Sequence, residues 1–107
     1  MELIQEHIDE IIALCEKHYV HDLYVFGSVL TDSFSSDSDI DFLVRFGDID
    51  LLEYFDNYME LKESLEKLLS RVVDLVEIQT VKNPILKRSI DHNKVLIYGR
   101  ADSKVAV

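Results

Sequence analysis

Two apolar segments of this chain, residues 23–26 and 40–44, each adjoin a short motif of small or acidic residues. The first segment leads directly into Gly27-Ser28, and after ten intervening residues Asp39-Ile40-Asp41 opens the second segment. Acidic residues are depleted in strands, so an acidic pair at this point is unusual. The pattern predicts two strands joined by a polar loop, with a small-residue bend ending one strand and two carboxylates opening the other.

The two motifs have complementary chemistry. Asp39 and Asp41 are two residues apart, so in an extended chain both carboxylates project from the same face and can reach one divalent cation. A hard cation with water and phosphate oxygens suits such ligands. Glycine lets the backbone approach a ligand closely, and the free N–H groups of Val29 and Leu30 at the start of a helix form an anion site. Together the motifs predict a site for a metal-bound polyphosphate.

The spacing of Gly-Ser, ten residues and Asp-x-Asp resembles that of the nucleotidyltransferase superfamily that includes DNA polymerase beta. The short chain resembles its smallest branch, the MNT-type minimal nucleotidyltransferases, which act as antitoxins beside HEPN-domain toxins. The resemblance covers roughly residues 20–100. It implies that Asp39 and Asp41 are metal ligands and that Gly27-Ser28 grips a nucleoside triphosphate. Relatives often have Arg-Ala after the Gly-Ser, where this chain has Val29-Leu30.

A third acidic residue, Asp74, lies within the apolar segment 72–78. Burying an unpaired carboxylate among branched apolar residues is costly, so Asp74 needs a cation or a hydrogen-bond network. The resemblance implies a third site carboxylate on this strand, which would face the same metal if the strand lies beside that of Asp41. The alternative is an edge-strand aspartate that faces solvent. Glu77 falls on the opposite face by its odd spacing and is not expected to be catalytic.

The remaining periodicity predicts helices over residues 3–18, over about 51–70 and from Asn83-Pro84 onward, with Asp50 and Asn83 as N-caps. His21 and Asp22 are expected to form a polar turn before the first strand, and residues 94–98 a short edge strand. The expected fold is α/β (α+β), a small mixed sheet packed with helices in the order α-β-α-β-α-β-α-(β). One domain over residues 1–107 is expected, with the N-terminal helix within 1–20 and a flexible tail over 99–107.

Helical spacing also predicts which side chains face inward. Apolar residues of the long helix and of the last helix recur at spacings of three and four. The predicted inward residues are Leu51, Phe55, Tyr58, Leu61 or Leu65, and Leu68 of the long helix, and Ile85, Leu86 and Ile90 of the last helix. Tyr54 and Tyr58 are interpreted as core or as a face for a partner rather than as a platform for a nucleotide base.

Composition narrows the function further. The 107 residues carry 21 acidic and 11 basic side chains, and the net charge of −10 argues against direct binding to nucleic acid. The single cysteine, Cys15, lies in an apolar helical pattern, so we expect a buried thiol and a reducing cytoplasm. No apolar run approaches the roughly 20 residues that a membrane span needs.

The residues therefore predict a metal-dependent nucleotidyl transfer, in which an acceptor hydroxyl attacks the α-phosphorus of a nucleoside triphosphate. One Mg²⁺ would be held by Asp39 and Asp41, and a second would be shared with Asp74. The resemblance implies transfer of AMP from ATP to a tyrosine of a cognate HEPN-type toxin. Two alternatives stay open: adenylylation of a small hydroxylated molecule, and a non-catalytic module that masks its partner by binding.

Overall fold

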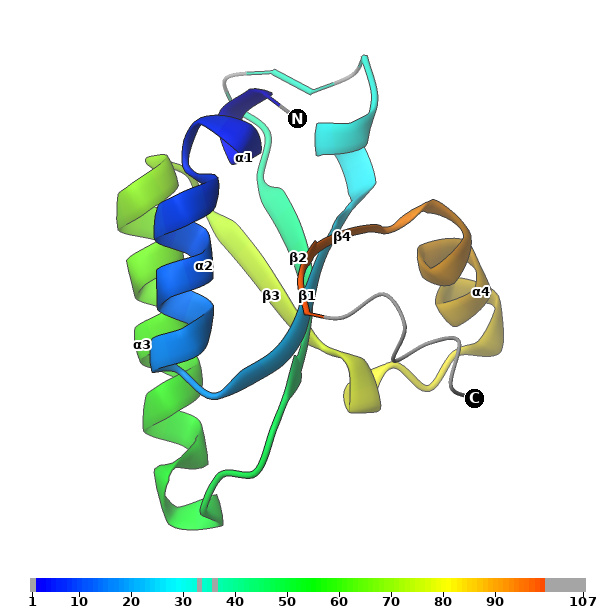
Figure 1. Ribbon diagram of the computed structural model, residues 1–107. Coiled ribbons are helices and arrows are strands. Elements are labelled where there is room, and N and C mark those ends of the chain that lie inside the picture. The colour runs from blue at the N-terminus through cyan, green and yellow to red at the C-terminus, as the bar shows by residue number, and fades with distance from the viewer. Residues whose placement is uncertain (1, 33, 36, 100–107) are drawn as a thin grey trace.

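The computed structural model describes residues 2–32, 34–35 and 37–99, whose strands form one mixed four-stranded sheet in the order β3-β2-β1-β4 (Figure 1). β1 (Val20–Phe26) is antiparallel to both β2 (Ile40–Phe46) and β4 (Val95–Tyr98), and β3 (Val73–Glu77) is parallel to β2. The predicted α/β class, the order of elements and the edge strand near residues 94–98 are confirmed. Residues 100–107 of the predicted tail lie outside the described residues.

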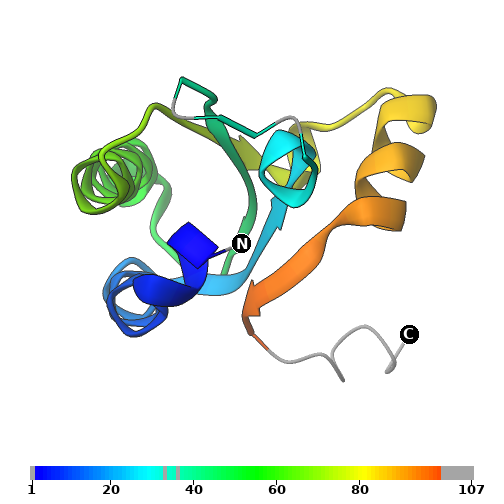
Figure 2. The same cartoon turned by 90° about the horizontal axis from the view of Figure 1, so that it is seen from above.

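Helices cover both faces of the sheet (Figure 2). α2 (Ile8–Lys17) and α3 (Leu51–Leu69) pack on one face, and α4 (Pro84–Asn93) lies on the other. The predicted N-caps are confirmed, because the side chain of Asp50 accepts the N–H of Leu52 at 3.0 Å and that of Asn83 accepts the N–H of Ile85 at 2.9 Å. No helix in the described part of the chain is both long and apolar enough to span a bilayer.

The predicted helix over residues 3–18 is divided into two. α1 (Glu2–Glu6) ends before His7, whose backbone at φ −118° and ψ 19° is not helical, and α2 begins at Ile8. The ring of His7 lies 3.0 Å from the carbonyl oxygen of Leu3. Ile4 and Ile11 are nevertheless both fully buried. Periodicity therefore identified the buried face, while the break at His7 was not predicted.

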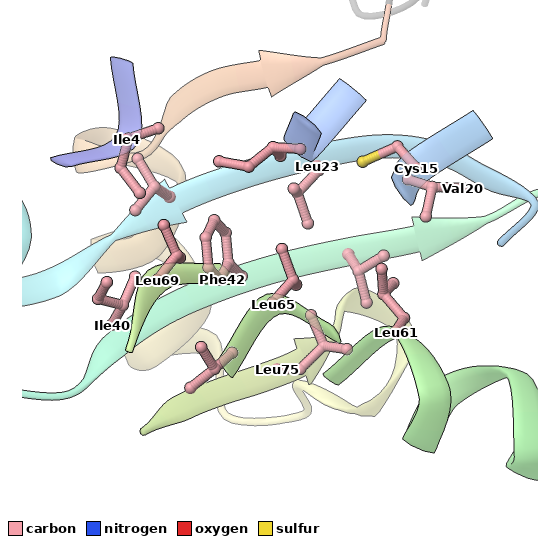
Figure 3. Close-up of a cluster of buried hydrophobic side chains, with 14 of the residues drawn as sticks. Ile4, Cys15, Val20, Leu23, Ile40, Phe42, Leu61, Leu65, Leu69 and Leu75 are labelled. Carbon is pink, nitrogen blue, oxygen red and sulfur yellow. The ribbon is translucent and has the colours of Figure 1, made fainter. Parts of the chain in front are cut away.

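The main core lies between the sheet and α1, α2 and α3 (Figure 3). Its fully buried side chains include Phe42 of β2, Leu61 and Leu65 of α3, and Cys15 of α2. Burial, with a smaller contribution from the charge of Glu16, raises the pKa of the Cys15 thiol to about 12. The expectation of a buried thiol is confirmed. A smaller cluster of Tyr24, Leu43 and Ile90 joins the opposite face of the sheet to α4.

Several predicted inward residues are in fact exposed. Leu51 and Phe55 of α3 are 86% and 68% exposed, because the first turns of this helix extend past the end of the sheet (Figure 1). Ile85 and Leu86 of α4 are 80% and 51% exposed, and only Ile90 of the predicted set in this helix is buried. The helical pattern was right in both cases, but the first turns of each helix remain largely exposed.

The predicted turn at His21 and Asp22 is wrong, since both residues belong to β1 and Asp22 is 2% exposed. Its carboxylate accepts a hydrogen bond from Nε of Arg45 at 3.0 Å and contacts the ring of His21. Burial acts to raise the pKa of Asp22, but the hydrogen bonds and charges of His21 and Arg45 outweigh burial and lower it. The ion pair therefore ties β1 to β2 at the end of the sheet distant from Gly27.

Arg45→Met is expected to lower the free energy of unfolding by about 2 kcal/mol at pH 7. Breaking a fully buried pair costs about 3–5 kcal/mol, and solvent screening reduces this figure because 41% of the Arg45 side chain is exposed. A lowered pKa stabilises the fold above the ordinary aspartate pKa, and this stability is lost as the pH falls through the folded-state pKa. Urea unfolding should therefore show a smaller loss of unfolding free energy for Arg45→Met below about pH 4 than at pH 7. The exposed Arg88→Met serves as the control and should change little at either pH.

Candidate active site

The predicted site residues come from three neighbouring strand ends. Phe26, at the end of β1, pairs with Asp41 at the start of β2, and Asp41 pairs in register with Asp74 of β3. Register partners on adjacent strands project from the same face of the sheet, so the carboxylates of Asp41 and Asp74 lie side by side. Asp39 precedes Asp41 by two residues. The condition set for Asp74, that its strand lies beside β2, is met.

The carboxylates lie on the α4 face of the sheet. Ile40, Phe42 and Val44 of β2 point into the main core, whereas Leu43 packs against α4. Asp41 lies between Ile40 and Phe42, so its side chain projects from the same face as Leu43. Asp74 is exposed rather than buried, because β3 is an edge strand, so its carboxylate does not need a partner to offset burial. The alternative prediction of an exposed aspartate on an edge strand was therefore right. The neighbouring carboxylate of Asp41 nevertheless keeps Asp74 a candidate site residue.

The bend at Gly27 touches the carboxylate of Asp41. Gly27 has a φ of +82°, and a Cβ atom added there would lie 2.3 Å from Oδ2 of Asp41. A φ in this range favours glycine, and a side chain at this position would displace the carboxylate of Asp41. The bend therefore lies directly beside the carboxylate of Asp41.

Burial, then the charges of Asp74 and Asp39, raises the pKa of Asp41. Among the described residues, however, no group of three or more His, Cys, Asp or Glu side chains is close enough to hold a metal ion. The raised pKa and the lack of a close ligand group are compatible, because charges repel one another over distances longer than those of metal coordination. The donor set fits a divalent cation such as Mg²⁺, because oxygen ligands suit it and its charge would offset the repulsion.

The segment after the bend is a single 3-10 turn, η1 (Gly27–Leu30). Val29, at the position where relatives often have arginine, is 4% exposed and packs into the main core. The N–H and the hydroxyl of Thr31 both donate to the carbonyl oxygen of Ser28 at 2.9 Å. A turn this short has little macrodipole, so a phosphate contact here would depend on the backbone N–H groups of the bend.

Arg71 holds the polar loop before Asp39, and no sequence pattern pointed to this role. Its Nη1 donates to the carbonyl oxygens of Ser35 at 2.8 Å and Ser38 at 3.1 Å. The guanidinium also lies 4.5 Å from the ring centroid of Phe34. Arg71 follows α3, more than thirty residues after the loop, so only the tertiary structure brings the two together. It is a positioning residue for Asp39 rather than a candidate ligand.

A groove of about 570 Å³ adjoins the bend between η1, α4 and β4. Its walls are mostly apolar, with a few hydroxyl and amide groups among them. The lining residues are Phe26, Gly27, Leu30, Thr31, Leu86, Ser89, Ile90, Asn93 and Val95. Leu86 is therefore partly exposed because it forms a wall of this groove. The sequence did not predict the groove.

Residues 9–103 match the family model described as polymerase beta, nucleotidyltransferase. The chain belongs to the polymerase beta nucleotidyltransferase family. This nucleotidyltransferase is 39% identical over 90 residues to "Protein adenylyltransferase MntA" of Thermococcus cleftensis, covering 79% of this chain and 88% of that protein. The predicted enzyme class is thereby confirmed.

Solved structures share the fold of this nucleotidyltransferase. A structure assigned as a minimal nucleotidyltransferase matches with a TM-score of 0.72 and 30% identity, over 88% of this chain and 92% of that chain. A second structure, of a tri-AMPylated Shewanella oneidensis HEPN toxin in complex with an MNT antitoxin, matches with a TM-score of 0.66 and 23% identity, over 95% and 77% of the two chains. The second likeness shows a common fold alone. The predicted minimal nucleotidyltransferase fold is confirmed.

Proposed function

We propose that this nucleotidyltransferase transfers AMP from ATP to a tyrosine hydroxyl of a HEPN-type toxin and so acts as an antitoxin. The observation that carries the proposal is the pairing of Asp41 with Asp74, directly beside the bend at Gly27. The name of the Thermococcus relative and the AMPylated toxin in the Shewanella complex support AMP as the transferred group and a HEPN-type toxin as the acceptor protein, and tyrosine is the acceptor residue that the family resemblance implies. Small hydroxylated acceptors have no comparable support among these relatives.

The residues divide into two roles. Asp39, Asp41 and Asp74 would hold Mg²⁺, in two ions as the sequence predicts, which neutralises the triphosphate and lowers the pKa of the attacking hydroxyl. Backbone N–H groups at Gly27 and Ser28 orient the β- and γ-phosphates. The acceptor oxygen bonds to the α-phosphorus, the bond from that phosphorus to the bridging oxygen breaks, pyrophosphate leaves and the hydroxyl proton passes to solvent.

The groove beside the bend supports a place for the nucleoside. A triphosphate at Gly27 and Ser28 has its nucleoside end within reach of apolar walls formed by Leu30, Leu86 and Ile90. Pockets of 300–1,000 Å³ with apolar walls and a few polar groups are typical of small-ligand sites. Ser89 and Asn93 supply polar groups at its edge.

The test is incubation with each of the four labelled nucleoside triphosphates and Mg²⁺, with and without the co-encoded HEPN-type protein, followed by intact mass measurement. We expect the partner to gain one or more AMP groups from ATP alone, on tyrosine by peptide mapping, and to gain none in the presence of a chelator. The opposite outcome is a stable complex in which the toxin is neutralised but gains no mass, both with the wild type and with Asp41→Asn. That outcome would replace the proposal with an antitoxin that acts by binding alone.

A further inference from the structure

The start of α3 carries an exposed apolar surface. Leu51, Leu52 and Phe55 are 86%, 90% and 68% exposed. Leu51 and Phe55 are four residues apart, so they are neighbours on the helix surface. Clustered large apolar side chains of this exposure are typical of interaction sites, unlike scattered single ones. Leu51, Leu52 and Phe55 are called the α3 patch below.

The α3 patch continues into a groove between α3 and the edge strand β3. The groove has a volume of about 420 Å³ and mainly apolar walls. It is lined by Tyr54, Phe55, Tyr58, Leu75, Val76, Glu77 and Thr80. Phe55 belongs to both the patch and the groove, so one partner surface can cover them together. The volume suits one or two large side chains.

The groove is not built for an added strand. β3 is an edge strand, but three of its backbone groups already have side-chain partners. The N–H of Val73 donates to Glu66 at 3.0 Å, the carbonyl oxygen of Leu75 accepts from the hydroxyl of Tyr58, and that of Glu77 accepts from Thr80 at 2.7 Å. Such capping blunts a sheet edge. This capping favours a partner that binds through side chains, as a helix does when it lies in a groove.

The charges around the patch select the partner. Residues 48–61 contain five acidic side chains and neither lysine nor arginine. Three of the acidic residues, Glu53, Asp56 and Glu60, line a polar pocket of about 310 Å³ on the same helix, in which Lys17 is the cation. A second copy of this chain would bring the same acidic rim and a further net charge of −10, so self-association here is repulsive. A basic rim on the partner is complementary.

The α3 patch is remote from the candidate active site. α3 begins just after β2 ends, whereas Asp41 lies at the opposite end of β2. Seven strand residues separate the two ends by roughly 20 Å. α3 also packs on the opposite face of the sheet from α4 (Figure 2). The carboxylates project from the α4 face. A protein bound at the patch itself lies at the far end of β2 from Asp41, whereas the groove extends along β3 as far as Leu75, which directly follows Asp74.

We propose that the α3 patch and its groove dock an amphipathic helix of the partner protein, with two or three large apolar side chains flanked by lysine or arginine. Docking is then separate from catalysis, so affinity for the partner does not depend on the carboxylates. The proposal rests on the proposed function only in taking the HEPN-type protein as this partner.

The test measures the affinity of the intact nucleotidyltransferase for the purified co-encoded HEPN-type protein by calorimetry. Phe55→Asp and the double variant Leu51→Ser/Leu52→Ser are expected to weaken binding at least about tenfold, as for central interface residues. The control is Ile85→Ser, an apolar residue of similar exposure on α4, which should leave affinity unchanged. Glu53→Gln/Asp56→Asn should slow association and reduce its salt dependence. Thermal unfolding confirms that each variant folds.

Several outcomes would overturn the docking proposal. The proposal fails if both patch variants bind the partner as tightly as the wild type does, or if only Ile85→Ser weakens binding. It also fails if the wild-type enzyme does not bind the partner, or if the isolated chain forms a homodimer that Phe55→Asp dissociates. The proposed function fails separately, if the complex forms through the patch but ATP yields no gain in mass on the partner. AMP transfer without a stable complex would keep the proposed function and reject the docking site.

Discussion

Asp41→Asn is expected to abolish AMP transfer and at the same time to stabilise the enzyme. In its proposed role as a metal ligand, Asp41 supplies several kcal/mol of charge stabilisation in the transition state, and a loss of about 4 kcal/mol corresponds to a thousandfold loss of kcat/KM. The folded state disfavours the charged form of Asp41, because burial and the charges of Asp74 and Asp39 raise its pKa. A neutral isostere removes that cost. We expect a gain of about 1 kcal/mol, or a Tm higher by about 4–8 °C.

The pH dependence tests the cause of this stabilisation. A raised folded-state pKa means that the contribution of Asp41 to stability is fully present below the unfolded pKa of about 3.9 and is lost as the pH rises through the folded pKa. The advantage of Asp41→Asn should therefore be present at pH 7 and disappear below about pH 4, in thermal scans without Mg²⁺. Asp48→Asn, an exposed aspartate far from the site, should show no such gain. A lower Tm at pH 7 or retained transfer would contradict the prediction.

Gly27→Ala is expected to lower both activity and stability. The added methyl group would lie 2.3 Å from Oδ2 of Asp41 and would occupy a backbone with a φ of +82°. Backbone strain of this kind costs about 1–3 kcal/mol. The carboxylate has to move as well, and a displacement of about 1 Å at a reacting centre can cost a hundredfold in rate. Steady-state transfer and urea unfolding measure the two effects.

Two controls separate these effects from a general intolerance of alanine. Gly47→Ala places its Cβ no nearer than 3.6 Å to the carbonyl oxygen of Tyr19, which is an ordinary contact, so stability and activity should change little. In an Asp41→Ala background the clash at residue 27 is gone, so Gly27→Ala should then cost less than in the wild type. Additive free energies in this double-mutant cycle would show that Gly27 and Asp41 do not interact.

Local chemistry made much of the fold predictable. Asp50 and Asn83 cap their helices because a short side-chain acceptor reaches the first free N–H groups, which depends on neighbouring residues only. The strands around Gly27-Ser28 and Asp39-x-Asp41 follow from apolar runs between turn residues. The exposure of Leu51, Phe55 and Ile85 was not predictable, because helical spacing shows which residues share a face but not where the sheet beneath ends.

The sequence by itself determined most of the elements, their class and the three acidic residues with chemical interest, because each depends on residue type and short spacing. Only the tertiary structure decided that Asp74 lies in register with Asp41, that Arg45 pairs with Asp22 and that Arg71 holds the loop before Asp39. These contacts join residues more than twenty positions apart in the chain. Strand register and side-chain pairing over such distances come from packing the whole sheet, and no local pattern specifies them.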